Sequence, residues 1–178
     1  MSTQAVYTSR EEIAVYRFTP AATLGLPLAA VVLQSLIPVA FHGRLHFFEI
    51  FDLPLLVTIF FGVARRNPAM GTITGCLIGL TQDALTGNYL GLFGISKSVV
   101  GYASSTIAGK IDVDNPGSRL ILTFAFYMLQ RVVYLLVQRG LVQENPPGEW
   151  LHSLGVALAN GLLAIVVFTL LDRFKRRS

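Results

Sequence analysis

The sequence is poor in the residues from which soluble enzymes build their active sites. It has a single cysteine, Cys76, so it holds no disulfide framework and no cysteine-based metal site. It contains neither a Gly-x-Ser-x-Gly nucleophile elbow nor a Walker A phosphate-binding loop. His42 and His46 are four residues apart, but only Glu49 lies near them as a third metal ligand. We therefore expect no catalytic residue, no metal and no cofactor.

Charge is also scarce, which excludes an ordinary soluble domain. Charged residues make up 13% of the chain, against roughly 25% in soluble domains. Hydrophobic residues make up 53%, and one domain of 178 residues cannot bury so many in its own core. We therefore expect lipid to be the solvent. The Lys and Arg residues lie at the ends of apolar runs rather than among aromatic residues, which argues against nucleic-acid binding.

The apolar runs predict six membrane-spanning helices. The expected spans are residues 20–41, 47–64, 69–85, 92–109, 120–137 and 150–171. Each approaches the roughly 20 residues that a helix needs to cross the hydrocarbon core. Pro54 predicts a kink inside the second span, just after Asp52. The predicted fold class is an all-α integral membrane bundle at residues 20–171, with a cytoplasmic N-terminal segment at 1–19 and a basic cytoplasmic tail at 172–178.

The positions of the cationic residues predict the orientation in the membrane. With six spans, both termini lie on one side, and that side holds Arg10, Arg17, Arg65, Arg66, Lys110, Arg119, Arg173, Lys175, Arg176 and Arg177. The other side holds only Arg44 and Arg139, while Lys97 and Arg131 fall within spans. Cytoplasmic segments of membrane proteins are enriched in Lys and Arg, so both termini are predicted to be cytoplasmic.

Two rows of small residues mark the third and fourth spans. Gly71, Gly75 and Gly79 repeat at a spacing of four, and Gly94 and Gly101 belong to a similar row. Residues at spacings of three and four lie on one face of a helix. A glycine face lets two helix backbones approach closely in lipid. The rows are predicted either to pack the bundle internally or to dock a partner helix.

Every predicted span also contains a polar or charged residue. These residues are Gln34, Asp52, Asp83, Lys97, Arg131 and Asn160. At about 1.5 Å per residue from the cytoplasmic ends, all six lie about 17–21 Å into the bilayer. An isolated charge at mid-bilayer costs at least roughly 2.5–3.5 kcal/mol, which pairing would reduce. One hypothesis is a polar network inside the bundle. The alternative is that Asp52, Asp83 and Lys97 reach water at the outer interface.

Part of the chain resembles a known family. The matching residues are Arg65-Arg66-Asn67-Pro68, Gly71, Gly75, Gly79-Leu80, Asp83, Gly87, Leu90-Gly91 and Gly101-Tyr102. This run is similar to the signature region of MreD, the family of bacterial rod shape-determining membrane proteins. The resemblance implies a non-enzymatic scaffold of the cell-elongation complex in the inner membrane. It also implies binding to MreC and, through MreC, contact with MreB, RodA and the class B penicillin-binding protein that build lateral peptidoglycan.

The resemblance also implies a likeness in architecture to the substrate-binding subunits, or S-components, of energy-coupling-factor transporters. A second functional class therefore stays open, in which the chain is a small-molecule-binding subunit of such a transporter. The polar layer would then line a pocket that opens to the outside. The external loops are short, whereas the pockets of those transporter subunits draw on long loops, and this counts against the second class.

Overall fold

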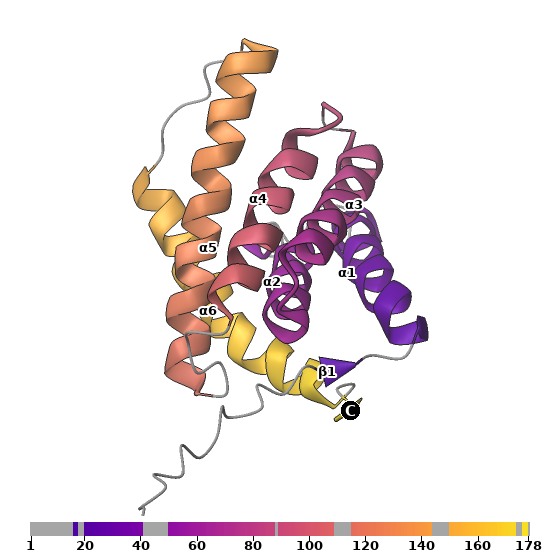
Figure 1. Cartoon of the computed structure of the whole chain (residues 1–178). Coiled ribbons are helices and arrows are strands. Elements are labelled where there is room, and N and C mark those ends of the chain that lie inside the picture. The colour runs from indigo at the N-terminus through magenta and orange to yellow at the C-terminus, as the bar shows by residue number, and fades with distance from the viewer. Residues whose placement is uncertain are drawn as a thin grey trace, which may run out of the picture.

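The computed structural model is a bundle of helices (Figure 1). It describes residues 16–17, 20–40, 50–87, 89–108, 115–143, 150–173 and 176–177. The described residues form six α-helices, α1 (Pro20–Ala40), α2 (Leu53–Arg65), α3 (Pro68–Thr86), α4 (Leu92–Ile107), α5 (Pro116–Val137) and α6 (Trp150–Asp172). A π-helical segment (Gln138–Val142) prolongs α5, and two short strands, β1 (Tyr16–Arg17) and β2 (Arg176–Arg177), flank the bundle. The expected all-helical bundle is confirmed.

Three helices begin at an Asp or Asn followed closely by proline. Asp52, Asn67 and Asn115 are the N-cap residues of α2, α3 and α5, and a proline stands at the first or second helical position of each. In all three, the side-chain oxygen accepts a hydrogen bond from a backbone N–H in the first turn. Such a bond satisfies a donor that has no partner within the helix, and proline is tolerated there because its missing N–H would be unpaired anyway.

The structure corrects the expected second span. α2 begins at Leu53 rather than near residue 47, so Asp52 caps the helix instead of lying inside it. Pro54 stands in the first turn and does not kink the helix. The 13 residues of α2 give a length of about 20 Å, which is shorter than the roughly 30 Å hydrocarbon core. Every residue from Pro54 to Ala64 is buried, so α2 is the central helix of the bundle.

α3 and α4 pack backbone against backbone. A Cβ added at Gly71, Gly75 or Gly79 would overlap a backbone carbonyl of α4. A Cβ added at Gly101 would overlap the Gly71 carbonyl in turn, and one at Gly94 would press on the Leu80 side chain. The glycine rows of the two helices therefore face each other inside the bundle and are not on its outer surface. At this contact, no residue larger than glycine fits without moving the helices apart.

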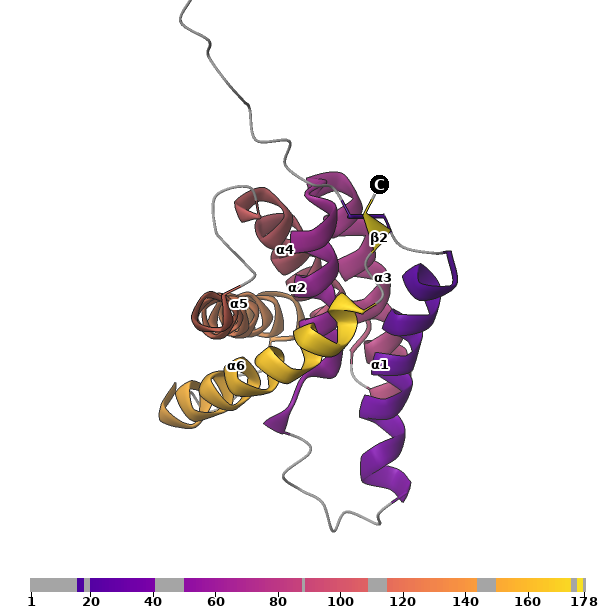
Figure 2. The same cartoon turned by 90° about the horizontal axis from the view of Figure 1, so that it is seen from below.

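Two short strands that are far apart in the sequence meet at one end of the bundle. β1 and β2 pair antiparallel, with Tyr16 opposite Arg177 and Arg17 opposite Arg176. Figures 1 and 2 place this pair at the end of the bundle opposite the α3–α4 turn. The structure therefore brings residues 16–17 and 176–177 together at this end of the bundle.

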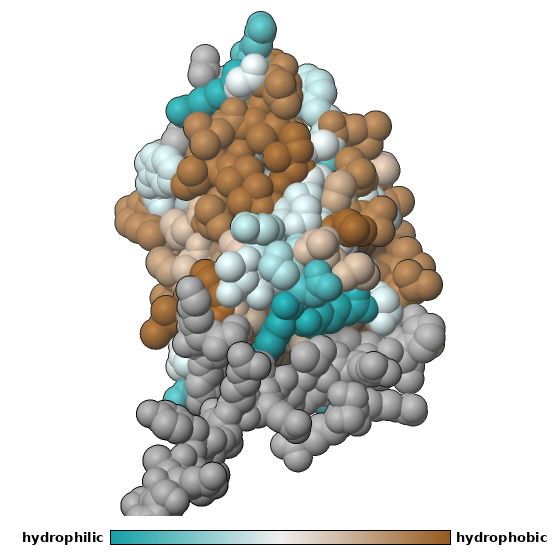
Figure 3. All heavy atoms as spheres, viewed as in Figure 1, coloured by the Kyte–Doolittle hydropathy of each residue, from teal (hydrophilic) through white to brown (hydrophobic). Residues whose placement is uncertain are grey.

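The outer surface of the bundle is apolar. Figure 3 shows hydrophobic side chains over much of one face. On α6, Leu151, Leu154, Leu158 and Leu162 are exposed at spacings of three and four. Among the described residues, two helical segments, 116–142 and 150–172, are long and apolar enough to cross a membrane by length and composition. Exposed leucine rows of this kind are typical of a surface that contacts lipid or a partner.

Candidate functional site: a polar cluster and a cavity inside the bundle

The centre of the site is an ion pair between Asp52 and Lys97. The Lys97 Nζ lies 2.7 Å from Asp52 Oδ2, and the Lys97 side chain is fully buried. Gln130 of α5 contacts both charges: its Oε1 accepts a hydrogen bond from Lys97 at 2.9 Å, and its Nε2 donates to Asp52 Oδ2 at 2.7 Å. The Lys97 ammonium also lies 4.9 Å from the centre of the Phe93 ring. These contacts join the start of α2 to α4 and α5.

Two side-chain amides bind the non-helical backbone that leads into α2. Gln34 of α1 donates to the Phe51 carbonyl at 2.8 Å and accepts from the Leu53 N–H at 3.2 Å. Asn160 of α6 accepts a hydrogen bond from the Asp52 N–H at 2.8 Å and donates one to the Ile50 carbonyl at 2.8 Å. Peptide groups outside a helix find no water in a bilayer core, so they need such protein partners. The short α2 therefore depends on polar side chains from α1 and α6.

We refer to Gln34, Asp52, Lys97, Gln130 and Asn160 as the Asp52 cluster. The sequence had singled out four of these five residues, and it had missed Gln130. Gln130 lies three residues after Tyr127 and four before Tyr134. It therefore shares a polar stripe with them, and this spacing was the signal that could have identified it. From the sequence alone, the neighbouring Arg131 is the predicted polar residue of this span, because it is charged.

Asp83 lies outside the cluster and closes the α3–α4 turn. Its carboxylate accepts hydrogen bonds from the backbone N–H groups of Gly91, Phe93 and Gly94 at 2.9, 3.1 and 3.1 Å. Gly91 has a φ of 104°, and α4 has no capping side chain of its own at that position. A carboxylate at a helix N-terminus is stabilised by unpaired N–H groups and by the helix dipole. The sequence placed Asp83 in one polar network with Lys97 and Arg131, but in the described structure its carboxylate contacts neither and caps α4 instead.

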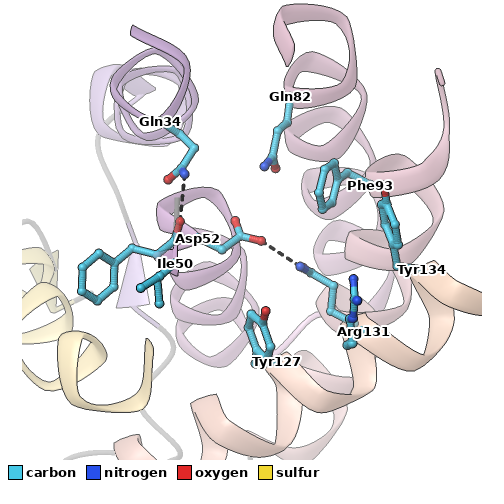
Figure 4. Close-up of a pocket in the computed structure, with 10 residues that line it drawn as sticks. Gln34, Ile50, Asp52, Gln82, Phe93, Tyr127, Arg131 and Tyr134 are labelled. Carbon is cyan, nitrogen blue, oxygen red and sulfur yellow. Dashed lines mark hydrogen bonds between the residues drawn. The ribbon is translucent and has the colours of Figure 1, made fainter. Parts of the chain in front are cut away.

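A polar cavity of about 200 Å³ lies beside the Asp52 cluster (Figure 4). Its walls come from α1, the segment before α2, α3, α4 and α5, and its polar lining includes Gln34, Asp52, Gln82, Tyr127, Gln130 and Arg131. In Figure 4 the Gln82 amide and the Tyr127 hydroxyl point toward the cavity. Arg131 borders the cavity, and among the described residues no carboxylate pairs with it.

An apolar groove of about 280 Å³ runs between α1 and α3. Leu24, Leu28, Ile73 and Leu77 are among the side chains that line it, and all four are exposed. Arg65 lies at the groove, and its guanidinium donates to the Thr23 hydroxyl at 2.9 Å. This groove is an apolar surface formed by α1 and α3, and it is separate from the glycine row of α3 that packs against α4.

The described residues offer no metal site. No group of three or more His, Cys, Asp or Glu side chains comes together among them. His42, His46 and Glu49 lie outside the described residues, and His152 is exposed on α6. Cys76 is a free, half-buried thiol.

A helical bundle with an apolar outer surface and its charges gathered inside belongs to the class of helical membrane proteins. The family model described as rod shape-determining protein MreD matches residues 17–174, which is nearly the whole chain. The chain therefore belongs to the MreD family, and the resemblance noted at residues 65–102 is confirmed. Family membership makes it a membrane protein of the rod-shape machinery. Comparison with curated proteins and with solved structures found no match.

Proposed function

We propose that this protein is a non-enzymatic scaffold that binds the membrane helix of MreC and thereby helps to control lateral peptidoglycan synthesis. The observation that carries this proposal is that the polar side chains lie inside the bundle while apolar side chains cover its outside. The polar groups of the Asp52 cluster and of Asp83 form hydrogen bonds that hold the helices together. The outer surface instead offers leucine rows and an apolar groove. These apolar surfaces are available to a partner helix, which supports the proposal.

We further propose that the chain crosses the inner membrane six times with both termini in the cytoplasm. The pairing of β1 with β2 supports a shared side for the two ends. Ten of the fourteen Lys and Arg residues lie in segments expected on that side. The positive-inside rule favours the cytoplasm for it. MreB, which the resemblance implies as an indirect partner, would meet the complex on this side, and RodA and the class B penicillin-binding protein would meet it in the membrane.

The α1–α3 groove is the proposed docking surface for the MreC helix. The glycine rows are occupied at the α3–α4 contact, so they leave no close-packing face for a partner. The groove residues on α3 run from Met70 to Thr81, a length of about 16 Å along the helix. Thr74 and Thr81 lie among them and provide the smaller side chains that helix contacts in lipid favour.

A tryptophan in the groove tests this docking surface. Leu77 is 60% exposed in the groove, and Leu158 on α6 is 49% exposed on another face. We expect Leu77→Trp to lower capture of full-length MreC from detergent at least tenfold, because the larger side chain fills the groove. Leu158→Trp is the matched control and should capture MreC as the unmodified protein does. Equal capture by both variants would place the contact elsewhere, and failure of the unmodified protein to capture MreC would refute the scaffold proposal.

The transporter-subunit alternative is less favoured, because the family match names a shape-determining protein. The expected likeness to S-components of energy-coupling-factor transporters stays a prediction. A thermal-shift screen of the purified protein against vitamins addresses it directly, since a reproducible micromolar ligand among them would support a transporter role.

A further inference from the structure

Arg131 places a positive charge at the polar cavity without a carboxylate partner among the described residues. The Asp52 carboxylate already accepts hydrogen bonds from Lys97 and Gln130, so its charge is matched. Among the described residues, no carboxylate contacts Arg131, which is half-buried at the cavity wall. A guanidinium is always charged, and its planar fork of donors fits carboxylate or phosphate oxygens. The cavity therefore favours an anion.

Gln82 provides a second, independent sign of a missing ligand group. Its side-chain Oε1 is buried and finds no hydrogen-bond partner within the part of the chain that the structure describes, and the residue is only 5% exposed. Figure 4 shows its amide turned into the cavity, across from Tyr127. Buried polar atoms are nearly always hydrogen-bonded. The Gln82 oxygen therefore marks a position where a ligand O–H or N–H would donate.

The size and the remaining walls of the cavity limit the ligand further. A volume of about 200 Å³ is many times the roughly 10–15 Å³ that a cavity needs to hold one water molecule, so there is room for a small polar group. Phe93 and Tyr134 form an aromatic wall, with their ring centres 4.9 Å apart. The Tyr127 hydroxyl, opposite Gln82, is a further donor for an anion with several oxygens. The oxygens of a phosphate point in tetrahedral rather than planar directions, so one phosphate can accept from Arg131 and Tyr127 on different sides.

We propose that the cavity binds a hydroxyl-bearing phosphate group, with Arg131 holding the phosphate and Gln82 accepting a hydrogen bond from the hydroxyl. Glycerol phosphate has this chemistry, either as the headgroup of phosphatidylglycerol or as a free molecule. The cavity includes residues from the ends of α3 and α4 near their turn, at the end of the bundle opposite β1 and β2. A lipid headgroup at that side of the bilayer would reach it. This binding is separate from the docking of MreC at the α1–α3 groove.

Binding to the full-length protein in detergent tests the proposal. The probes are phosphatidylglycerol, phosphatidylcholine and free sn-glycerol 3-phosphate, and binding is measured by native mass spectrometry with titration. We expect saturable binding of a glycerol phosphate probe and weaker binding of phosphatidylcholine, which lacks the hydroxyl donors. Arg131→Gln should weaken binding at least tenfold. The matched control is Arg139→Gln, which removes an exposed cation from the π-helical segment and should change affinity less than twofold.

The remaining outcomes separate the source of the ligand from the existence of the site. Binding of phosphatidylglycerol alone identifies a lipid site, and binding of free glycerol phosphate identifies a soluble ligand. Gln82→Met keeps the size of the side chain but removes the acceptor, and it should weaken binding about threefold or more. This variant carries the test if Arg131→Gln melts at a lower temperature than the unmodified protein. The proposal is overturned if the folded protein binds neither probe, or if the Gln82 and Arg131 variants bind as tightly as the Arg139 control.

Discussion

At the scale of single residues, Asp52 is where most of the polar contacts converge. One carboxylate oxygen caps α2 through the Leu55 N–H at 2.9 Å, and the other pairs with Lys97 and accepts from Gln130. A buried ion pair is costly to form, because both charges leave water. Its value here is geometric: one side chain sets where α2 begins and ties that point to α4 and α5.

Removing one charge of this pair should destabilise the protein strongly. Breaking a buried ion pair costs about 3–5 kcal/mol, because the remaining charge stays buried without a partner. The Asp52 side chain is 12% exposed at the cavity, so we expect Lys97→Met to cost about 3 kcal/mol, at the lower end of that range. The free energy of unfolding of the detergent-solubilised protein is measured by thermal and by chemical denaturation.

The double variant isolates the pair. Asp52→Asn with Lys97→Met removes both charges while Asn keeps a cap for α2, so its loss should be smaller than the sum of the two single losses. Arg139→Met, at an exposed position, serves as the control and should leave stability unchanged. Additive losses in the double variant would show that the two charges do not stabilise each other.

At the scale of helices, the α3–α4 pair is held by shape at its glycine rows and by Asp83 at its turn. The backbones touch where Gly75 of α3 meets Lys97 of α4. This close approach also carries the Lys97 side chain into the bundle, where it reaches Asp52. The packing of two helices and the position of one buried charge are therefore linked.

A single methyl group at this contact should separate the helices. Gly75→Ala puts a Cβ into the Lys97 carbonyl, a backbone atom that cannot move alone, and overpacking of this kind costs about 1–3 kcal/mol. Gly155→Ala on α6 is the matched control, because nothing lies within 4 Å of an added Cβ there. Alanine also favours a helix over glycine, so the control should be neutral or stabilising. The comparison is made by thermal unfolding, and equal melting temperatures would rule out the tight contact.

At the scale of the whole molecule, the β1–β2 pair and the π-helical extension of α5 lie at opposite ends of the bundle (Figure 1). A single native cysteine makes this arrangement easy to probe. In a Cys76→Ser background, a cysteine appended to the C-terminus should react with a membrane-impermeant maleimide only after bacterial spheroplasts are lysed. Gly140→Cys, in the exposed π-helical segment, should react in intact spheroplasts. Labelling of both sites from the same side would exclude the proposed topology.

Much of the architecture could be predicted from local sequence. Asn67-Pro68 and Asn115-Pro116 mark helix starts, because an Asn cap and a following proline satisfy the first turn wherever they occur. The start of α2 was missed, since Ile50 and Phe51 are apolar but do not belong to an α-helix. An apolar run by itself does not distinguish a helix from a buried extended segment.

The sequence by itself determined the helical class, the membrane character, the family, and most of the polar residues that find partners inside the bundle. These follow from composition, periodicity and motif, which are local properties of the chain. Only the tertiary structure decided which partner each residue meets. Spacing places Asp83 and Gly75 on one helix face, but the neighbour of that face depends on how all the helices pack. In the folded bundle Asp83 binds the start of α4, and Lys97 binds Asp52 and Gln130. Arg131 borders the polar cavity.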